Sequence, residues 1–441
     1  GLDATARTGG SHTVTATVSN TNPSVTAVNA SVSLSFTDGN LATYPAVLPP
    51  RAQLGNIPPN SSRTHTWTIS TGGEGRAYPR LVAQARGVMP IQKTGTISIQ
   101  TTATIAEAGS ILKDASRIAI IGDSFSSGEG TKNYVDMDTA SKGCHRSLDA
   151  YALHLYSVTD KAIQIACSGA VVHDYLYPNI GRGRAAQAGY LSDLFRDKTT
   201  TPQVVMLTFG GNDIGFAELV TKCALAGDCT TKKYYDKSLP KDQQVPFSLP
   251  ERKYAHAMSM VEPLTKVYEA IGATLHNAAP KGTPQIPIIV LPYAQVVTDT
   301  ASDSCSNLNN NERKFAVQLL QTLNKSIKEA VAAARAQGVP VYYAEDVIKA
   351  LLPGHTACAA TEEERYVNDL SAGEYIKPQG EALQEMMHPD VDGHRAITNS
   401  LIDWSTRPEV ETQWATDKTA AIGTGTNWFL HVRVPTTLPT A

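Results

Sequence analysis

The sequence predicts an immunoglobulin-like β-sandwich over residues 1–107, followed by an α/β domain with a doubly wound, five-stranded parallel sheet over residues 108–410. Three observations support this division. The chain of 441 residues is long enough for two or three domains. Its first part shows period-two alternation, and its second part alternates short apolar segments with amphipathic ones. Residues 411–441 form a C-terminal extension that fits neither pattern.

The first domain is predicted from runs of Thr, Ser and Val at alternate positions. Such runs are typical of half-buried strands. Clusters of Asn, Pro, Gly and Ser, such as residues 20–23 and 58–62, separate the runs and indicate turns. Strands are expected at residues 12–19, 30–36, 64–70, 80–86 and 94–105. Short strands at this spacing are typical of an immunoglobulin-like sandwich.

The second domain is predicted from five buried strands and the helices between them. The strands are expected at residues 117–121, 162–165, 204–207, 286–291 and 339–343. Two helices have apolar residues at helical spacing on one face: Val261, Leu264, Val267, Tyr268, Ile271 and Leu275, and then Leu320, Leu323, Ile327, Ala330, Val331 and Ala334. Gly338 follows the second helix where a C-cap is expected. Alternating strands and helices favour a parallel, doubly wound sheet.

Two segments interrupt this alternation. Residues 230–252 and 352–380 are polar and loop-like, and the first of them is either a lid over a site or an ordinary surface excursion. A third helix is expected over residues 395–404. The extension contains one expected strand, residues 428–434.

Composition excludes several classes of protein. Hydrophobic residues make up 41% and charged residues 18%, which is typical of a folded chain. The net charge of -3 gives no electrostatic reason to bind nucleic acid or an acidic membrane. No apolar run approaches the ~18 residues of a transmembrane helix. Residues 1–10 lack the pattern of a signal peptide, which is compatible with a mature or trimmed form.

Six cysteines lie in the second domain: Cys144, Cys167, Cys223, Cys229, Cys305 and Cys358. They form no C-x-x-C pair, which argues against a zinc site. Fifteen disulfide connectivities are possible, and pairing of nearest neighbours along the chain is the simplest. The other interpretation is six buried free thiols in a cytosolic protein. An even number of cysteines favours disulfides and an oxidising, extracytoplasmic location.

Four segments carry the residues of a candidate active site. Ser124 follows the first predicted strand, Gly169 the second, and Asn212 the third, while His388 stands in a late loop. Ligands of open α/β sheets bind at the carboxyl ends of the strands, so these residues are expected to converge. We expect Ser124 to be the nucleophile and His388 the general base and acid. The N–H groups of Ser124 and Gly169 and the Asn212 amide would form an oxyanion hole.

The same residues resemble those of a known family. Gly122-Asp-Ser124, Gly169, Gly211-Asn212-Asp213 and His388-Pro389 match, in order, the four blocks of the SGNH (GDSL) hydrolases. The likeness covers about residues 115–405 and is closest to secreted bacterial esterases and lipases. It implies a flavodoxin-like three-layer fold, a serine esterase activity without a cofactor, and three disulfides between sequential cysteines.

The acidic member of the catalytic set is open. The family often has Asp three residues before the histidine, where this chain has Glu385. Glu385 is therefore a candidate third catalytic residue. The alternative is a Ser–His dyad oriented by the backbone carbonyl of Met386 or Glu385.

Neighbouring polar residues have simpler explanations. His394 competes with His388, but Gly393-His394 resembles a helix start. Asp213 is expected to cap the helix that follows it, and Asp123 to hold the nucleophile turn through backbone hydrogen bonds. The acids at 136, 138, 390 and 392 could suggest calcium, but solvated loops are the commoner explanation and no metal is expected.

The sequence thus predicts a secreted, monomeric esterase that hydrolyses lipid acyl esters or acylated polysaccharide. It is expected to bind neither nucleic acid nor a membrane through a transmembrane segment. The alternative is a cell-surface or polymer-binding protein whose hydrolase domain is inactive.

Overall fold

The computed structural model divides the chain into two compact units, Gly1–Glu107 and Ala108–Ala441. In unit 1 the structure describes residues 11–20, 27–37, 51–70, 78–86 and 97–101. In unit 2 it describes residues 109–419 with gaps at 114, 116, 136–142, 156–161, 199, 217–218, 220–222, 224–227, 236–239, 281, 301–304, 306–307, 363 and 369–384. Each unit is described by itself.

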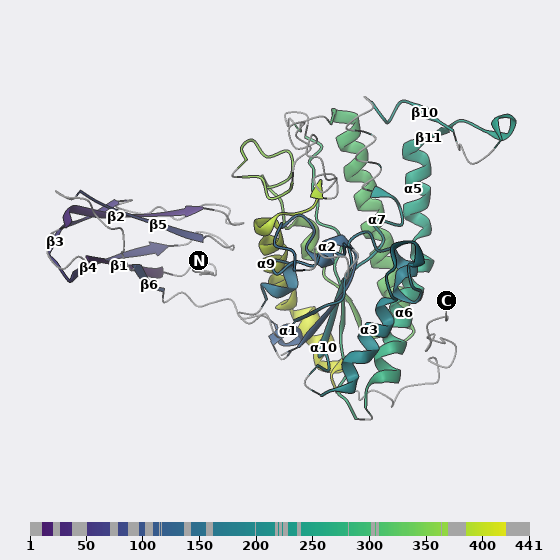
Figure 1. Cartoon of the computed structure of the whole chain (residues 1–441), viewed down its shortest axis with the longest axis horizontal. Coiled ribbons are helices and arrows are strands. Elements are labelled where there is room, and N and C mark those ends of the chain that lie inside the picture. Colours follow the sequence, from purple (N-terminus) through teal and green to yellow (C-terminus); the bar gives the residue numbers. More distant parts are fainter. Residues whose placement is uncertain are drawn as a thin grey trace. The chain divides into compact units, whose positions relative to one another are not determined.

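Unit 1 contains two three-stranded antiparallel sheets in the order β4-β1-β6 and β3-β2-β5 (Figure 1). The strands are β1 (Ser11–Asn20), β2 (Ala27–Thr37), β3 (Arg51–Ile57), β4 (Ser61–Ser70), β5 (Tyr78–Arg86) and β6 (Ile97–Thr101). Ala16 and Trp67 of one sheet share a small apolar core with Val32 and Ala52 of the other. The immunoglobulin-like topology of this unit remains a prediction.

Strand β3 was absent from the expected strands of unit 1. Its alternation is broken at Gly55, which has a positive φ of 69°. Around this glycine the pairing of β2 with β3 shifts register between Ala27 and Ser31. A bulged strand does not keep a strict period of two, so a search for alternation misses it.

Unit 2 is built on a five-stranded sheet in the order β13-β12-β9-β7-β8, with all neighbouring pairs parallel. The strands are β7 (Ile118–Gly122), β8 (Ala162–Gln164), β9 (Val204–Thr208), β12 (Ile288–Val290) and β13 (Val341–Tyr343). The five predicted strands and their parallel arrangement are thus confirmed. Strands β12 and β13 are shorter than expected, because Pro287 and Pro340 have no N–H for a sheet hydrogen bond.

Helices cover both faces of this sheet. The helices are α1 (Ser110–Lys113), α2 (Ser124–Ser127), α3 (Gln187–Asp193), α5 (Leu249–Ser259), α6 (Val261–Ala278), α7 (Asn310–Ala336), α9 (Val391–Ser405) and α10 (Pro408–Asp417). Figure 1 shows α1, α9 and α10 on one side of the sheet and α3 and α6 on the other. The two predicted amphipathic helices correspond to α6 and α7, and their apolar faces are buried.

The strand order places the topological switch point of the sheet between β7 and β9. From β7 the chain goes first to β8 on one side and then crosses to β9 on the other. In doubly wound sheets, loops leave such a point in opposite directions and open a crevice at the carboxyl ends of the strands. Ser124 directly follows β7, and Asn212 follows β9. The fold therefore places both residues just after the carboxyl ends of these two central strands.

Two boundaries differ from the expected ones. The helix expected from residue 395 begins at Val391, because the Asp390 side chain caps it by accepting the Gly393 N–H at 2.9 Å. Helix α10 continues across the expected boundary at 410/411, and its Glu411 accepts hydrogen bonds from the N–H and hydroxyl of Ser110, both at 2.6 Å. The expected strand at 428–434 lies outside the described residues.

The polar segment 230–252 contains a short antiparallel pair, β10 (Lys233–Tyr234) with β11 (Phe247–Ser248), and the first turn of α5. Residues 236–239 of this segment are not described. In the part of the chain that the structure describes, no helix is both long and apolar enough to cross a membrane.

Candidate active site

The nucleophile turn joins β7 to α2. Gly122 ends the strand with a φ of 115°, and a Cβ there would lie 2.3 Å from the Thr208 carbonyl oxygen, so only glycine fits. Asp123 caps α2 by accepting the Phe125 N–H at 3.2 Å, which confirms its expected structural role. Ser124 is the first residue of this helix and is 6% exposed. The turn thus fixes a nearly buried hydroxyl at the end of a central strand.

His388 reaches Ser124 from the loop before α9. Its Nε2 lies 2.7 Å from the Ser124 Oγ, and its Nδ1 lies 3.0 Å from the Met386 carbonyl oxygen. A carbonyl can only accept a hydrogen bond, so Nδ1 must carry the proton. In the neutral ring, Nε2 then presents its lone pair to the serine hydroxyl. This arrangement suits removal of the Ser124 proton.

Glu385 makes a different contact from the one expected of a third catalytic residue. Its Oε1 accepts a hydrogen bond from the Tyr134 hydroxyl at 2.9 Å. The Met386 carbonyl is the group that bonds to Nδ1 of His388. Of the two alternatives that the sequence left open, this geometry favours the dyad oriented by a backbone carbonyl.

The loops of Gly169 and Asn212 are joined to the nucleophile turn by hydrogen bonds. The Cys167 N–H donates to the Gly122 carbonyl at 3.0 Å, and the Asn212 Nδ2 donates to the Ala170 carbonyl at 2.9 Å. Nδ2 carries two hydrogens, so one remains for a ligand. Among the described residues, neither the Ser124 N–H nor the Gly169 N–H donates to another group. Three donors are thus available in the loops after β7, β8 and β9.

His394 and Asp213 have roles in the fold. His394 is fully buried, and its Nδ1 accepts the Tyr151 N–H at 3.2 Å. Burial, with a smaller effect of the nearby His154, lowers the pKa of His394 to about 3, so this ring stays neutral. Asp213 accepts the Val172 N–H at 3.2 Å and so caps the turn at Val172–Tyr175. Much of the helix expected after Asp213 lies outside the described residues, so a cap on that helix stays a prediction.

Sequence reasoning missed a buried network behind the nucleophile. The carboxylate of Asp123 accepts hydrogen bonds from Thr208 at 2.6 Å and from the Tyr293 hydroxyl, which itself accepts the Gly211 N–H at 2.8 Å. Burial raises the pKa of Asp123 to about 7, although these hydrogen bonds oppose the shift. Tyr293 follows β12 as Ser124 follows β7. Its position just after a central strand was the one sequence signal that could have placed it near Ser124.

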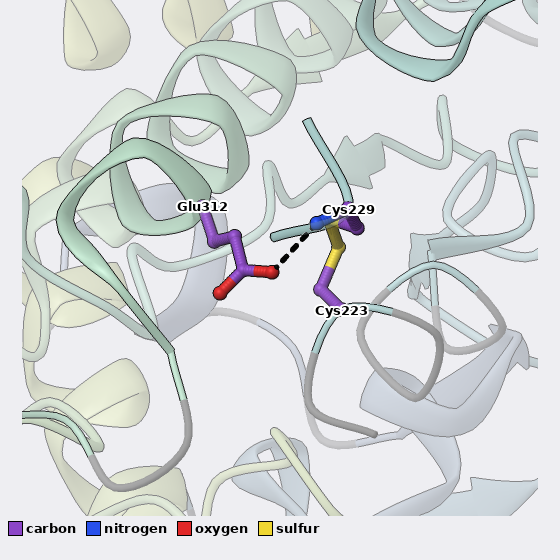
Figure 2. Close-up of side chains that lie close together, drawn as sticks. All are labelled: Cys223, Cys229 and Glu312. Carbon is purple, nitrogen blue, oxygen red and sulfur yellow. Dashed lines mark hydrogen bonds between the residues drawn. A yellow bond between two sulfur atoms is a disulfide. The ribbon is translucent and has the colours of Figure 1, made fainter. Parts of the chain in front are cut away.

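All six cysteines form disulfides between sequential partners: Cys144 with Cys167, Cys223 with Cys229, and Cys305 with Cys358. Cys144–Cys167 joins the segment of His145 to the segment of Gly169. Figure 2 shows Cys223, Cys229 and Glu312, the group within the described residues whose spacing could suit a metal ion. The two sulfurs are bonded to each other, and the Glu312 carboxylate accepts the Cys229 N–H at 3.0 Å. These three residues therefore form a disulfide whose loop is hydrogen-bonded to Glu312.

The acids considered for calcium divide into two sets. Asp390 caps α9, and Asp392 forms an ion pair with Arg395 at 2.9 Å. Positions 136 and 138 lie outside the described residues. Asp390 thus caps the start of α9, and Asp392 pairs with a cation on the surface of the same helix.

The chain is similar to known bacterial lipases. Lipase 1 of Streptomyces coelicolor is 26% identical over 270 residues, which cover 58% of this chain and 79% of that protein. A lipase of Streptomyces rimosus is 33% identical over 129 residues, 27% of this chain and 41% of that protein. The crystal structure of phospholipase A1 from Streptomyces albidoflavus superposes with a TM-score of 0.44 at 22% identity, over 65% of this chain and 99% of that one.

The profile of the GDSL-like Lipase/Acylhydrolase family matches residues 120–396, more than half of the chain. This range contains Ser124, Gly169, Asn212 and His388, the residues whose loops meet at the carboxyl edge of the sheet. The chain therefore belongs to the GDSL-like lipase/acylhydrolase family and is a carboxylic ester hydrolase.

Proposed function

We propose that unit 2 hydrolyses carboxylic esters through an acyl-enzyme on Ser124. The observation that carries this proposal is the 2.7 Å contact between Nε2 of His388 and Oγ of Ser124, with Nδ1 bonded to the Met386 carbonyl. Oγ attacks the ester carbonyl carbon while His388 takes its proton. The intermediate then expels the alcohol, to which His388 returns that proton. In the second half of the reaction His388 deprotonates a water molecule, which attacks the acyl carbon. The bond between that carbon and Oγ then breaks, the acid leaves, and the proton on His388 returns to Oγ.

The proposed oxyanion hole consists of the N–H groups of Ser124 and Gly169 and the free hydrogen of the Asn212 amide. It is supported by the bond from Asn212 to the Ala170 carbonyl, which orients the amide before substrate arrives. Donors that are fixed in advance stabilise the developing negative charge without reorganising during the reaction.

We propose a lipid acyl ester as the substrate, because of the turn beside Gly169. Arg182 lies against this glycine: a Cβ on Gly169 would be 2.2 Å from an Arg182 Nη. Two residues earlier, Ile180 is 82% exposed. Asn179 holds the turn through hydrogen bonds with Arg184, 2.8 and 3.0 Å between the backbones. A fixed turn that exposes an isoleucine and a cation suits contact with a lipid surface better than with a polysaccharide.

A secreted location is proposed from the three disulfides. Disulfides persist in oxidising compartments and are rare in the cytosol. The location can be checked by assaying ester hydrolysis in the culture medium and in washed cells of the producing organism.

The test of the proposed function compares wild type with Ser124→Ala on p-nitrophenyl acetate. We expect kcat to fall by at least about 10⁴-fold, because the nucleophile is lost, while the midpoint of thermal unfolding stays near that of wild type. Ser126→Ala, which removes a buried hydroxyl two residues away, is the matched control and should keep most of the activity. Hydrolysis retained by Ser124→Ala would contradict the acyl-enzyme, and a wild type without turnover would favour the inactive binding protein.

A further inference from the structure

Glu129, five residues after the nucleophile, carries a fully buried carboxylate that the mechanism above does not use. Its two oxygens lie 2.9 and 3.0 Å from Nδ1 of His145. It also accepts from the Tyr134 hydroxyl at 3.2 Å and from the Ser168 side chain. A buried carboxylate is costly unless it is paired and hydrogen-bonded, and this one is held on several sides.

The segment that holds Glu129 packs directly on the loop of His388. A Cβ on the next residue, Gly130, would lie 3.0 Å from the Cβ of His388. The Asn368 amide bridges the two segments by donating to the carbonyls of Gly130 at 2.9 Å and His388 at 3.1 Å. The residue next to Glu129 thus packs directly against the residue that we propose as the catalytic base.

Glu129 is negatively charged at neutral pH. Burial raises its pKa, but the hydrogen bond from His145 and the charges of His388 and His145 bring that pKa below its ordinary value. Burial and the Glu129 charge raise the pKa of Tyr134, so the phenol keeps its proton and donates it.

We propose that Glu129 is a positioning residue for His388: its buried negative charge stabilises the imidazolium that forms when Ser124 loses its proton. In a triad, a carboxylate on Nδ1 both orients and stabilises the imidazolium. Here the Met386 carbonyl orients the ring, and Glu129 supplies the charge through space. This inference rests on the proposed role of His388.

Other groups near His388 can also affect how the activity depends on pH. His394 of α9 interacts with it but stays neutral. The Glu385 carboxylate shares the single Tyr134 hydroxyl proton with Glu129. His145 is paired with Glu129, and the Phe125 ring packs 5.2 Å from the imidazole. Among these groups Glu129 and Glu385 carry the two carboxyl groups, so the experiment must separate them.

The experiment measures kcat/KM against pH for wild type, Glu129→Gln, Glu385→Gln and Glu312→Gln with p-nitrophenyl acetate. An opposite charge favours the protonated ring, so its loss lowers the pKa of His388. For Glu129→Gln we expect the acidic limb to move down by about one pH unit. The plateau should fall about tenfold, the equivalent of one unit. Glu312→Gln removes another buried carboxylate, which bonds to the Cys229 N–H, and should leave the limb in place.

An unmoved acidic limb in folded Glu129→Gln would overturn the proposal, as would a shift produced by Glu385→Gln instead. Loss of activity without a shift would assign Glu129 a structural role only and also overturn it. If Glu129→Gln does not fold, NMR titration of His388 in Ser124→Ala replaces it. A pKa above about 6.5 supports the proposal and a lower one overturns it. Failure of the proposed function is distinct, because Ser124→Ala would then stay active whatever Glu129 does.

Discussion

Nδ1 of His388 donates to the carbonyl of Met386, two residues earlier, at 3.0 Å. A backbone carbonyl therefore fixes the tautomer of the ring that we propose as the catalytic base, and no side-chain carboxylate is needed for this. The Glu385 carboxylate, which the family pattern suggested, bonds to Tyr134.

This contact predicts the outcome of Glu385→Gln. Loss of the carboxylate from a Ser-His-Asp triad costs about 10⁴-fold in kcat. We expect Glu385→Gln to lower kcat less than about tenfold, because the Met386 carbonyl still holds the ring. Steady-state kinetics on p-nitrophenyl acetate measure this, with the exposed Glu364→Gln as the control. A loss near 10⁴-fold would restore Glu385 as the third catalytic residue.

Asn212 should act on the transition state. Removing one oxyanion donor typically lowers kcat about 10²- to 10³-fold. We expect this loss for both Asn212→Ala and Asn212→Asp, with KM nearly constant, because the aspartate keeps the size but not the N–H. Asn311→Ala, at an exposed position of α7, is the control amide. If Asn212→Asp kept wild-type kcat, the amide could not be a donor to the oxyanion.

Asp123 predicts a pH dependence of stability. Its pKa is 3.8 when unfolded and about 7 when folded, so the folded state binds more protons between these values. Raising the pH from about 4 to 7 therefore lowers the free energy of unfolding, and Asp123→Asn should remove about 1–3 kcal/mol of this decrease. Urea denaturation at several pH values measures the difference. Parallel curves for wild type and Asp123→Asn would show that Asp123 is ionised throughout.

The turn beside Gly169 predicts a selective effect on lipid substrates. Burying an isoleucine side chain is worth about 1.5–3 kcal/mol, so losing its contact with a lipid surface should cost about tenfold or more. We expect Ile180→Ser to lower the ratio of activity on emulsified long-chain esters to activity on dissolved p-nitrophenyl acetate by about this factor. Val245→Ser, at a residue that is 75% exposed, is the control. Equal ratios in the two variants would argue against a lipid contact at Ile180.

The sequence predicted those parts of the fold and site that depend on local pattern. The strands β7 and β9 are buried at every position and apolar up to their last residues, Gly122 and Thr208, so their ends, and with them Ser124 and Asn212, could be located. Strand β3 could not, because its bulge at Gly55 breaks the alternation.

Contacts between distant segments were not predictable in the same way. The hydrogen bond from Tyr293 to Asp123 joins residues 170 positions apart, and that from Tyr134 to Glu385 joins residues 251 apart. No local spacing encodes either pair. The burial of the Glu129 carboxylate could not be predicted either, since an acid between two glycines in a turn is ordinarily solvated. Its burial becomes visible only when the His388 loop packs on it.

Main-chain groups connect the loops of the reaction centre: the Asp123 N–H bonds to the Thr208 carbonyl at 3.1 Å, and the Cys167 N–H to that of Gly122 at 3.0 Å. Every amino acid other than proline offers the same amide and carbonyl, so these links survive when neighbouring side chains are exchanged. Laboratory evolution could therefore diversify the 177–184 turn to redirect substrate preference while the chemistry beneath it stays intact.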